Sequence, residues 1–195
     1  IRDITEKSKV AAVQQKAAAE KKEALDKQAI VIAKEDAIAT KALEEAIPAL
    51  TAAKEALNDI DQKSLTEIKA LASPPAVIEA VCGIAYFLYP KTGSDASWSN
   101  IKVGLLGDMR LLNNLKEYEV SKTKADGASR AKKKYNQLVK DLGVGEGEEL
   151  QKLITSKSFA TGGMFKWANS TLKCYDIYKN VEPLKKKAEK MKQEK

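Results

Sequence analysis

The chain has 195 residues and a formal net charge of +7, from 34 Lys and Arg residues against 27 Asp and Glu residues. It contains no histidine, which excludes histidine metal ligands, Ser-His and Cys-His catalysis and a histidine pH switch. Because only 6% of the residues are aromatic while 31% are charged, we expect a small core joined to an extended part.

The basic balance indicates an acidic partner, and charge by itself does not choose between nucleic acid, anionic lipid and an acidic protein surface. Arginine, which dominates phosphate and base-edge recognition, is scarce, and aromatic residues are not interleaved with the lysines as base stacking requires. No run of about 18 apolar residues occurs, so we expect no transmembrane helix. These features argue against a nucleic acid or a membrane as the partner.

The two cysteines, Cys82 and Cys174, lie in apolar helical contexts and follow no disulfide framework. We expect two buried free thiols, which suit a reducing, cytoplasmic compartment. The chain has no starting methionine, and it begins and ends inside helical patterns. We therefore interpret it as a fragment of a longer protein.

Residues 1–57 contain no glycine and one proline, Pro48, and their apolar residues recur at helical spacing. In one row the apolar residues are seven positions apart, and a second row lies beside the first. Further along the chain, the apolar residues are spaced about four and three positions apart in turn. The first row is Val10, Ala17, Ala24, Val31 and Ile38, the second is Leu25, Ile32 and Ala39, and the continuation is Leu43, Ile47, Leu50 and Leu57, with Lys54 at one position of the row. Such spacing predicts a coiled-coil helix. Because the row is rich in alanine and drifts between two neighbouring registers, we expect its register to be weakly held.

The end of the chain repeats this pattern, in steps of three and four, through Cys174, Ile177, Val181, Leu184, Ala188 and Met191. Two heptad segments on either side of a more globular middle predict an all-α fold, an antiparallel two-helix coiled coil capped by a small globular bundle of about six short helices. The predicted boundaries are 1–57 for the outgoing helix, 58–170 for the helical domain and 171–195 for the returning helix. The first arm is the longer one, so either its early residues overhang or the return helix continues beyond this fragment.

The first half of the middle predicts a short helix after Asp59 and Asp61, ended by Ser73-Pro74-Pro75 because the residue before a proline avoids helical dihedral angles. Residues 75–89 are apolar on every side and predict the buried core helix. The turn residues of 90–97 predict a loop.

The second half predicts four more short helices and then the return helix. Short helices are expected over 98–106, 108–118, 128–142 and 148–155, with an irregular stretch at 119–127 and a flexible break at 143–147. Gly162-Gly163 is interpreted as a turn, after which Met164 opens the return helix.

No chemistry-bearing motif emerges from this pattern. The stretch Gly143-Val144-Gly145-Glu146-Gly147 lacks the Lys-Ser/Thr pair of a phosphate-binding loop, and no strand precedes it. Neighbouring carboxylates such as Glu148 and Glu149 diverge on a helix, whereas acid–base catalysis needs groups that converge. We expect no catalytic residue, no metal and no cofactor, and hence no enzyme in this fragment.

Several short motifs occur in an order and spacing that match one family. They are LTEIKALASPP at 65–75, an apolar helix at 77–88, Trp98 before a basic helix, LLGD at 105–108, GGMFKWA at 162–168 and VEPL at 181–184. Together with both flanking arms, these residues resemble the stalk and microtubule-binding domain of dynein heavy chains. The LLGD form is common in axonemal dyneins, and Gly162-Gly163 departs from the cytoplasmic form. The Lys-rich segment 117–147 also departs from it, and the resemblance assigns this segment no role.

The resemblance implies a tip that binds the groove between tubulin subunits through its first, third and sixth helices, where basic residues meet acidic tubulin. Matching by position implies tubulin contacts at Lys69, Lys63, Lys102, Lys152 and Lys157. Glu67 matches an acidic position that can form a switch pair or tune binding. It also implies that the stalk helices slide to relay nucleotide state, with Pro48 and Pro183 at the junction of coil and domain.

The parent motor would be an ATPase with its catalytic ring elsewhere in the chain. The resemblance also implies a location on the cytoskeleton, in the axoneme of a cilium or flagellum, and some outer-arm dyneins carry a leucine-rich-repeat light chain on this tip. The competing interpretation is an antiparallel coiled-coil arm of a scaffold or nucleic-acid-binding protein with a basic tip.

Overall fold

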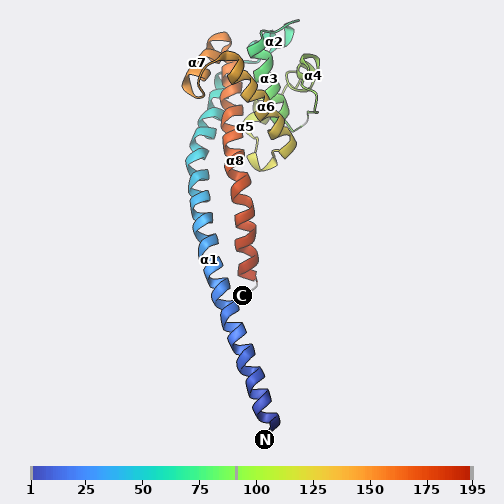
Figure 1. Ribbon diagram of the computed structural model, residues 1–195. Coiled ribbons are helices and arrows are strands. Elements are labelled where there is room, and N and C mark those ends of the chain that lie inside the picture. Colours follow the sequence, from blue (N-terminus) through green and yellow to red (C-terminus); the bar gives the residue numbers. More distant parts are fainter. Residues whose placement is uncertain (1, 91, 194–195) are drawn as a thin grey trace. The chain divides into compact units, whose positions relative to one another are not determined.

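A computed structural model describes residues 2–90 and 92–193 of the chain, and the side chains of 9–90, 92–187, 189 and 190. The described residues form eight α-helices, two short 3-10 helices and no strand, which confirms the predicted all-α class (Figure 1). The chain divides into two compact units. We call residues 1–42 with 179–195 the coil unit, and residues 43–178 the globular unit.

The two longest helices, α1 (Arg2–Ala56) and α8 (Phe159–Gln193), each contribute to both units. In the coil unit, the half-buried residues of α1 include Ala29, Ile32, Asp36 and Ala39, in steps of three, four and three. On α8, Val181 is buried and Leu184 is half-buried, whereas the predicted positions Ala188 and Met191 lie outside the described side chains.

The predicted first row on α1 is wrong, and its neighbour is the one that packs. Val31 and Ile38 are 54% and 72% exposed, while Ile32 and Ala39 are half-buried. Continued at the same spacing into the globular unit, the packed row reaches Leu43, Ala46, Leu50, Ala53 and Leu57. Ile47, which was expected in the row, is 49% exposed. The large side chains at Leu43, Leu50 and Leu57 set the phase, and Val31 and Ile38 lie one residue, or about 100°, out of it.

The globular unit contains the short helices. They are α2 (Gln62–Ala70), α3 (Ala76–Leu88), α4 (Trp98–Gly104), α5 (Leu111–Lys116), α6 (Ala125–Leu142) and α7 (Glu148–Lys157), with 3-10 helices at Leu57–Asp59 and Val120–Lys122. The predicted helices are therefore present with shifted ends: α6 begins three residues earlier than expected, and α5 is shorter than the expected 108–118.

Helix α3 forms the centre of the core, as its all-round apolar sequence predicts, and α6 packs along it. Two glycines allow the close approach of these helices. A Cβ at Gly127 would meet the carbonyl oxygen of Phe87, and a Cβ at Gly83 would meet the stem of Lys134. Tyr135 of α6 also stacks on Phe165 of α8, with ring centroids 5.8 Å apart.

Gly162-Gly163 is not a turn, which corrects the prediction. Helix α8 begins at Phe159 and runs through both glycines. Their lack of a side chain is used for packing, because a Cβ at Gly162 would meet Thr155 of α7 and a Cβ at Gly163 would meet the side chain of Ile60. Glycine in a helix is unfavourable by itself, so these close contacts explain why the helix contains two of them.

Both cysteines are buried free thiols, as predicted. Burial raises the pKa of Cys82 to about 12. Cys174 donates a hydrogen bond from Sγ to the carbonyl oxygen of Ala46 at 3.5 Å, which connects α8 to α1 within the globular unit. Among the described residues, no helix is both long enough and apolar enough to cross a membrane.

Candidate functional site

Helix α2 presents three of the predicted site residues on its outer side. Leu65 and Ile68 are buried and anchor the helix, so Lys63, Glu67 and Lys69 remain exposed. The helix begins at Asp61, whose side chain accepts a hydrogen bond from the Ser64 N–H at 2.7 Å. That bond is the N-cap arrangement, which satisfies one of the free donors in the first turn.

Hydrogen bonds from Ser64 hold the pKa of the Asp61 carboxyl below its usual value, and the charge of Lys63 acts in the same direction. The cap is therefore ionised at neutral pH, where its negative charge also interacts favourably with the beginning of the helix. Helix α2 thus has a defined start, a buried side and an exposed basic side.

The end of α2 is tied to the beginning of α4. The indole N–H of Trp98 donates a hydrogen bond to the carbonyl oxygen of Leu71 at 2.9 Å, and Leu71 is the C-cap of α2. Lys102 lies in the last turn of α4 and is half-buried. This bond places Lys69 and Lys102 on two helices that are held to each other.

Helix α7 carries the remaining predicted lysines. Its buried residues Leu150 and Ile154 anchor it to the core, and it also contacts α3. Lys152 forms an ion pair with Glu148 at 3.6 Å, in which both side chains are highly exposed, so the pair contributes little to stability. Lys157 ends the helix and is exposed, and no hydrogen bond or ion pair joins it to another residue in the described part of the chain.

Helix α3 connects these elements, because α2 precedes it directly while α4 and α7 both contact it. Of the three helices that carry the predicted lysines, α4 and α7 therefore rest on α3, and α2 leads directly into it. Glu67 has no hydrogen bond or ion pair to any other described residue, so the structure supplies no switch partner for it. Its predicted role stays a prediction.

The two predicted junction prolines lie inside long helices, Pro48 in α1 and Pro183 in α8. Both are exposed. A proline cannot donate the helical hydrogen bond, and its ring clashes with the preceding turn. Both prolines lie near a boundary between the two units. Pro48 is five residues after Leu43, where the globular unit begins, and Pro183 is four residues after Lys179, where the coil unit resumes.

A cluster that the sequence analysis missed joins three helices of the globular unit. Lys54 of α1 donates a hydrogen bond from Nζ to the Tyr118 carbonyl oxygen at 2.5 Å, and burial lowers the pKa of Lys54. The Tyr118 ring packs edge-on against Trp167 of α8, whose indole N–H donates to the Leu115 carbonyl oxygen at 3.0 Å. The one feature of the sequence that could have indicated this cluster was Lys54, a lysine within an apolar heptad row.

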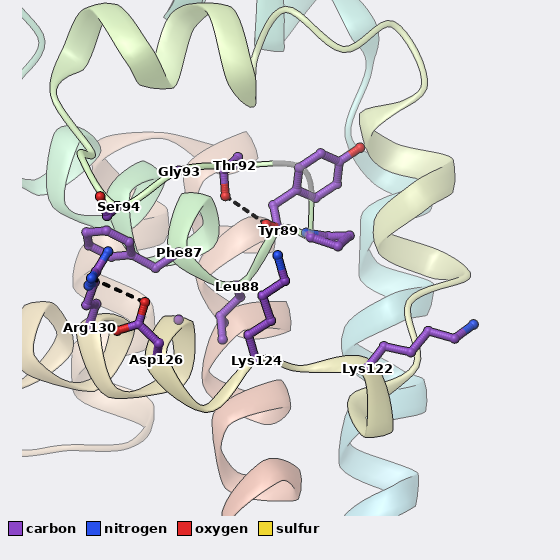
Figure 2. A pocket seen from close by; sticks show the side chains of 12 residues that line it. Phe87, Leu88, Tyr89, Thr92, Gly93, Ser94, Lys122, Lys124, Asp126 and Arg130 are labelled. Atoms are coloured by element: carbon purple, nitrogen blue, oxygen red, sulfur yellow. Dashed lines mark hydrogen bonds and ion pairs between the residues drawn. The ribbon is translucent and has the colours of Figure 1, made fainter.

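A second missed feature is a cavity of about 180 Å³ between the end of α3 and the beginning of α6 (Figure 2). Its walls include Phe87, Leu88 and Pro90, and its charged lining residues are Lys122, Lys124, Asp126 and Arg130. All four charged residues belong to the Lys-rich segment that the sequence singled out without a role.

The net charge is unevenly divided between the units. By sequence, the coil unit has 16 Lys and Arg residues against 10 Asp and Glu residues, whereas the globular unit has 18 against 17. The globular unit is thus nearly neutral as a whole. Any attraction of an acidic partner to it depends on where individual cations lie, and not on its net charge.

The described residues contain no group of side chains suited to holding a metal ion. The fold and the exposed lysines define a class of protein, a helical binding domain joined to a coiled coil. A model of the family described as the microtubule-binding stalk of dynein motor matches residues 4–195. The chain belongs to this family.

Curated relatives agree with that assignment. The chain is 33% identical over 144 residues to the ciliary dynein beta chain of Heliocidaris crassispina, covering 72% of this chain and 3% of the relative. It is 29% identical over 188 residues to dynein axonemal heavy chain 10 of Homo sapiens, covering 96% of this chain and 4% of the relative. It is 27% identical over 171 residues to dynein heavy chain-like protein 1 of Plasmodium falciparum (isolate 3D7), covering 87% of this chain and 3% of the relative.

The chain therefore spans only 3–4% of the length of these relatives. The resemblance inferred from the short motifs is confirmed, and so is its axonemal character, since two of these three relatives are ciliary or axonemal heavy chains. The match lies in the stalk of the motor, a non-catalytic region, which confirms that these residues are not an enzyme.

Proposed function

We propose that this chain is the track-binding end of an axonemal dynein heavy chain, and that it binds tubulin through lysines on α2, α4 and α7. The match of the stalk family to residues 4–195 carries the proposal. The arrangement of α2 supports it, because Leu65 and Ile68 hold the helix while Lys63 and Lys69 face outward.

Lys69 is the principal contact in this proposal, and Lys63 and Lys102 assist it. Lys69 lies in the last turn of α2, next to the Leu71 carbonyl that Trp98 holds. Lys152 and Lys157 on α7 extend this surface. Lys152 also forms an ion pair with Glu148. Glu67 projects from the same helix as Lys69 and would repel acidic parts of the track, which limits the strength of binding.

The test is co-sedimentation of the wild-type chain and of Lys69→Glu with stabilised microtubules, with duplex DNA and RNA as competitors. We expect the substitution to weaken binding by about tenfold or more while leaving helix content unchanged, because Lys69 is exposed and packs against nothing in the core. Lys140→Glu is the matched control, since Lys140 is an exposed lysine in the last turn of α6.

Equal binding by folded Lys69→Glu and wild type would remove Lys69 from the interface. Displacement of the wild-type chain by DNA or RNA would favour the nucleic-acid-binding arm instead. Binding that weakens with added salt is expected in either case, because exposed charges are screened, so salt serves only as a consistency check.

The proposal also covers how nucleotide state is relayed through the stalk and where the parent chain is located. Sliding of α1 against α8 would transmit the nucleotide state of the parent ATPase, with Pro48 and Pro183 marking where coil and domain join. The ciliary and axonemal names of the relatives support a location of the parent chain in the axoneme of a cilium or flagellum. If that parent belongs to an outer arm, a leucine-rich-repeat light chain is a further partner, which co-purification of the two chains would test.

A further inference from the structure

The cavity between the end of α3 and the beginning of α6 lies far from α2, the helix that carries the principal proposed contact. Helix α3 has 13 residues, so its two ends are about 20 Å apart, and the cavity lies at the end remote from α2. Its volume of about 180 Å³ is below the roughly 300–1,000 Å³ of clefts that hold drug-sized ligands. A site of this size suits one or two side chains of a partner.

Contacts within the globular unit hold the cavity open without a ligand. On one rim, the hydroxyl of Thr92 donates to the carbonyl oxygens of Tyr86 and Tyr89, and the Gly93 N–H donates to the Tyr86 hydroxyl at 3.2 Å. On the opposite side, Gly127 contributes no side chain and lies against the carbonyl oxygen of Phe87. The rims are therefore fixed by the fold.

Among the described residues that line the cavity, Lys124 is the cation without an ion pair. Arg130 pairs with Asp126 at 3.2 Å, and Lys122 pairs with Glu119 at 3.1 Å. No hydrogen bond or ion pair joins Lys124 to another residue within the described ranges. Figure 2 shows the Lys124 ammonium pointing into the space beside Leu88 and Thr92, whereas that of Lys122 points away.

Apolar walls beside the Lys124 ammonium group match a side chain with an aliphatic stem and a terminal carboxylate. The stem would lie along Phe87, Leu88 and Pro90, and the carboxylate would meet Lys124. We propose that this cavity binds a glutamate side chain from an acidic, flexible segment of the microtubule to which α2 docks. The source of that segment rests on the proposed function, whereas the chemistry of the cavity does not.

A fluorescently labelled peptide of ten consecutive glutamates tests the chemistry without any microtubule. We expect the wild-type chain to bind it in a fluorescence anisotropy titration. Lys124→Glu and Lys124→Gln should weaken binding by about fivefold, because they remove the ammonium group that would meet the carboxylate. Lys133→Glu, a charge-matched control at an exposed position of α6, the helix that Lys124 precedes as its N-cap, should leave the affinity unchanged.

Three results of this titration would overturn the proposal. They are no binding by the wild-type chain, equal weakening by Lys133→Glu, and displacement of the peptide by inorganic phosphate beyond the effect of sodium chloride at the same ionic strength. The last result would assign the cavity to a small anion.

Co-sedimentation with intact microtubules and with microtubules stripped of their acidic tails tests the source. Lys124→Glu should weaken binding to intact microtubules about as much as removal of the tails weakens wild-type binding, and the two changes should not add. Additive losses would overturn the tail as the source. Failure of the wild-type chain to bind any microtubule would overturn the proposed function, while the peptide titration still decides the glutamate site.

Discussion

The carboxylate of Asp61 begins the helix that carries the principal proposed contacts. It accepts from the Ser64 N–H at 2.7 Å, and this bond exists only while the oxygen can accept. Since α2 has nine residues, too few to be stable as an isolated helix, its first turn depends on the cap and on the burial of Leu65 and Ile68.

The lowered pKa of Asp61 predicts an acid-dependent loosening of α2. A carboxyl whose pKa is depressed by folding contributes stability that is fully present above its unfolded pKa of about 3.9 and is lost as pH falls through the folded value. An NMR titration should show the Asp61 carboxyl titrating below about 3.9 and the Ser64 amide shifting with it. Asp61→Asn, which can cap without titrating, should abolish that shift, and a normal midpoint in the wild type would contradict the argument.

Asp36 is a carboxylate in a row of packed residues. It is half-buried between Ile32 and Ala39 on α1, and its Oδ1 atom is buried without a hydrogen-bond partner. A buried polar atom without a partner costs free energy, and a polar residue in a coiled-coil row is retained for register and not for stability.

Asp36→Leu should therefore stabilise the coil unit, by about 1–3 kcal/mol in the free energy of unfolding. Thermal melting followed by circular dichroism measures the change. The control is Glu35→Leu, which removes the same charge at an exposed position beside the row. A similar rise in stability in both variants would attribute the effect to net charge. A fall in stability in Asp36→Leu alone would show that the carboxylate has a stabilising partner.

At the scale of elements, α7 and the beginning of α8 are fastened by close contact and by hydrogen bonds. Gln151 of α7 donates from Nε2 to the Gly162 carbonyl oxygen at 2.8 Å and to Thr155 Oγ1 at 3.1 Å. Gly162 is buried against Thr155, so the two helices approach nearer than any residue with a Cβ would allow.

Gly162→Ala should destabilise the globular unit although alanine favours helix over glycine by about 1 kcal/mol. The added Cβ would lie 2.8 Å from the Cα of Thr155, which is backbone and cannot turn aside. We expect a loss of about 1–3 kcal/mol in chemical denaturation. Gly145→Ala is the control, because nothing lies within 4 Å of a Cβ there and its φ is not positive. Unchanged or increased stability of Gly162→Ala would show that α7 moves freely.

At the scale of the whole molecule, the proposed relay requires that the register of α1 against α8 changes track affinity. Cys174 supplies a native thiol for testing this, since its Sγ lies 3.5 Å from the Ala46 carbonyl oxygen. The other thiol, Cys82, is buried and has a pKa raised to about 12, so it does not compete.

Ala46→Cys should form a disulfide with Cys174 that holds α1 and α8 in the register of this structure. Leu50→Cys should form a disulfide with Cys174 only in a register displaced by four residues, and so should trap that register. We expect the microtubule affinities of the two oxidised variants to differ by roughly 5–150-fold, the usual range of coupling between sites. Reduction should restore wild-type affinity in both. Equal affinities after complete oxidation would rule out register as the relay.

Much of this architecture is predictable because it depends on local pattern. The all-round apolar helix α3, the Pro74-Pro75 stop after α2 and the exposed lysines of α2 each follow from residues that are close in sequence. The family motifs are short and local in the same way. What pattern could not decide was which of two adjacent rows on α1 packs, because a row through Val31 and a row through Ile32 differ by one position.

The sequence by itself determined that this chain is all-helical, has heptad segments on both sides of a helical domain and resembles the dynein stalk family. The tertiary structure alone decided the packed row on α1, the helical state of Gly162-Gly163, the Lys54–Tyr118 bond and the cavity beside Lys124. The physical reason is that helix periodicity is a property of neighbours, whereas close approach, burial and the pairing of charges depend on residues that only folding brings together.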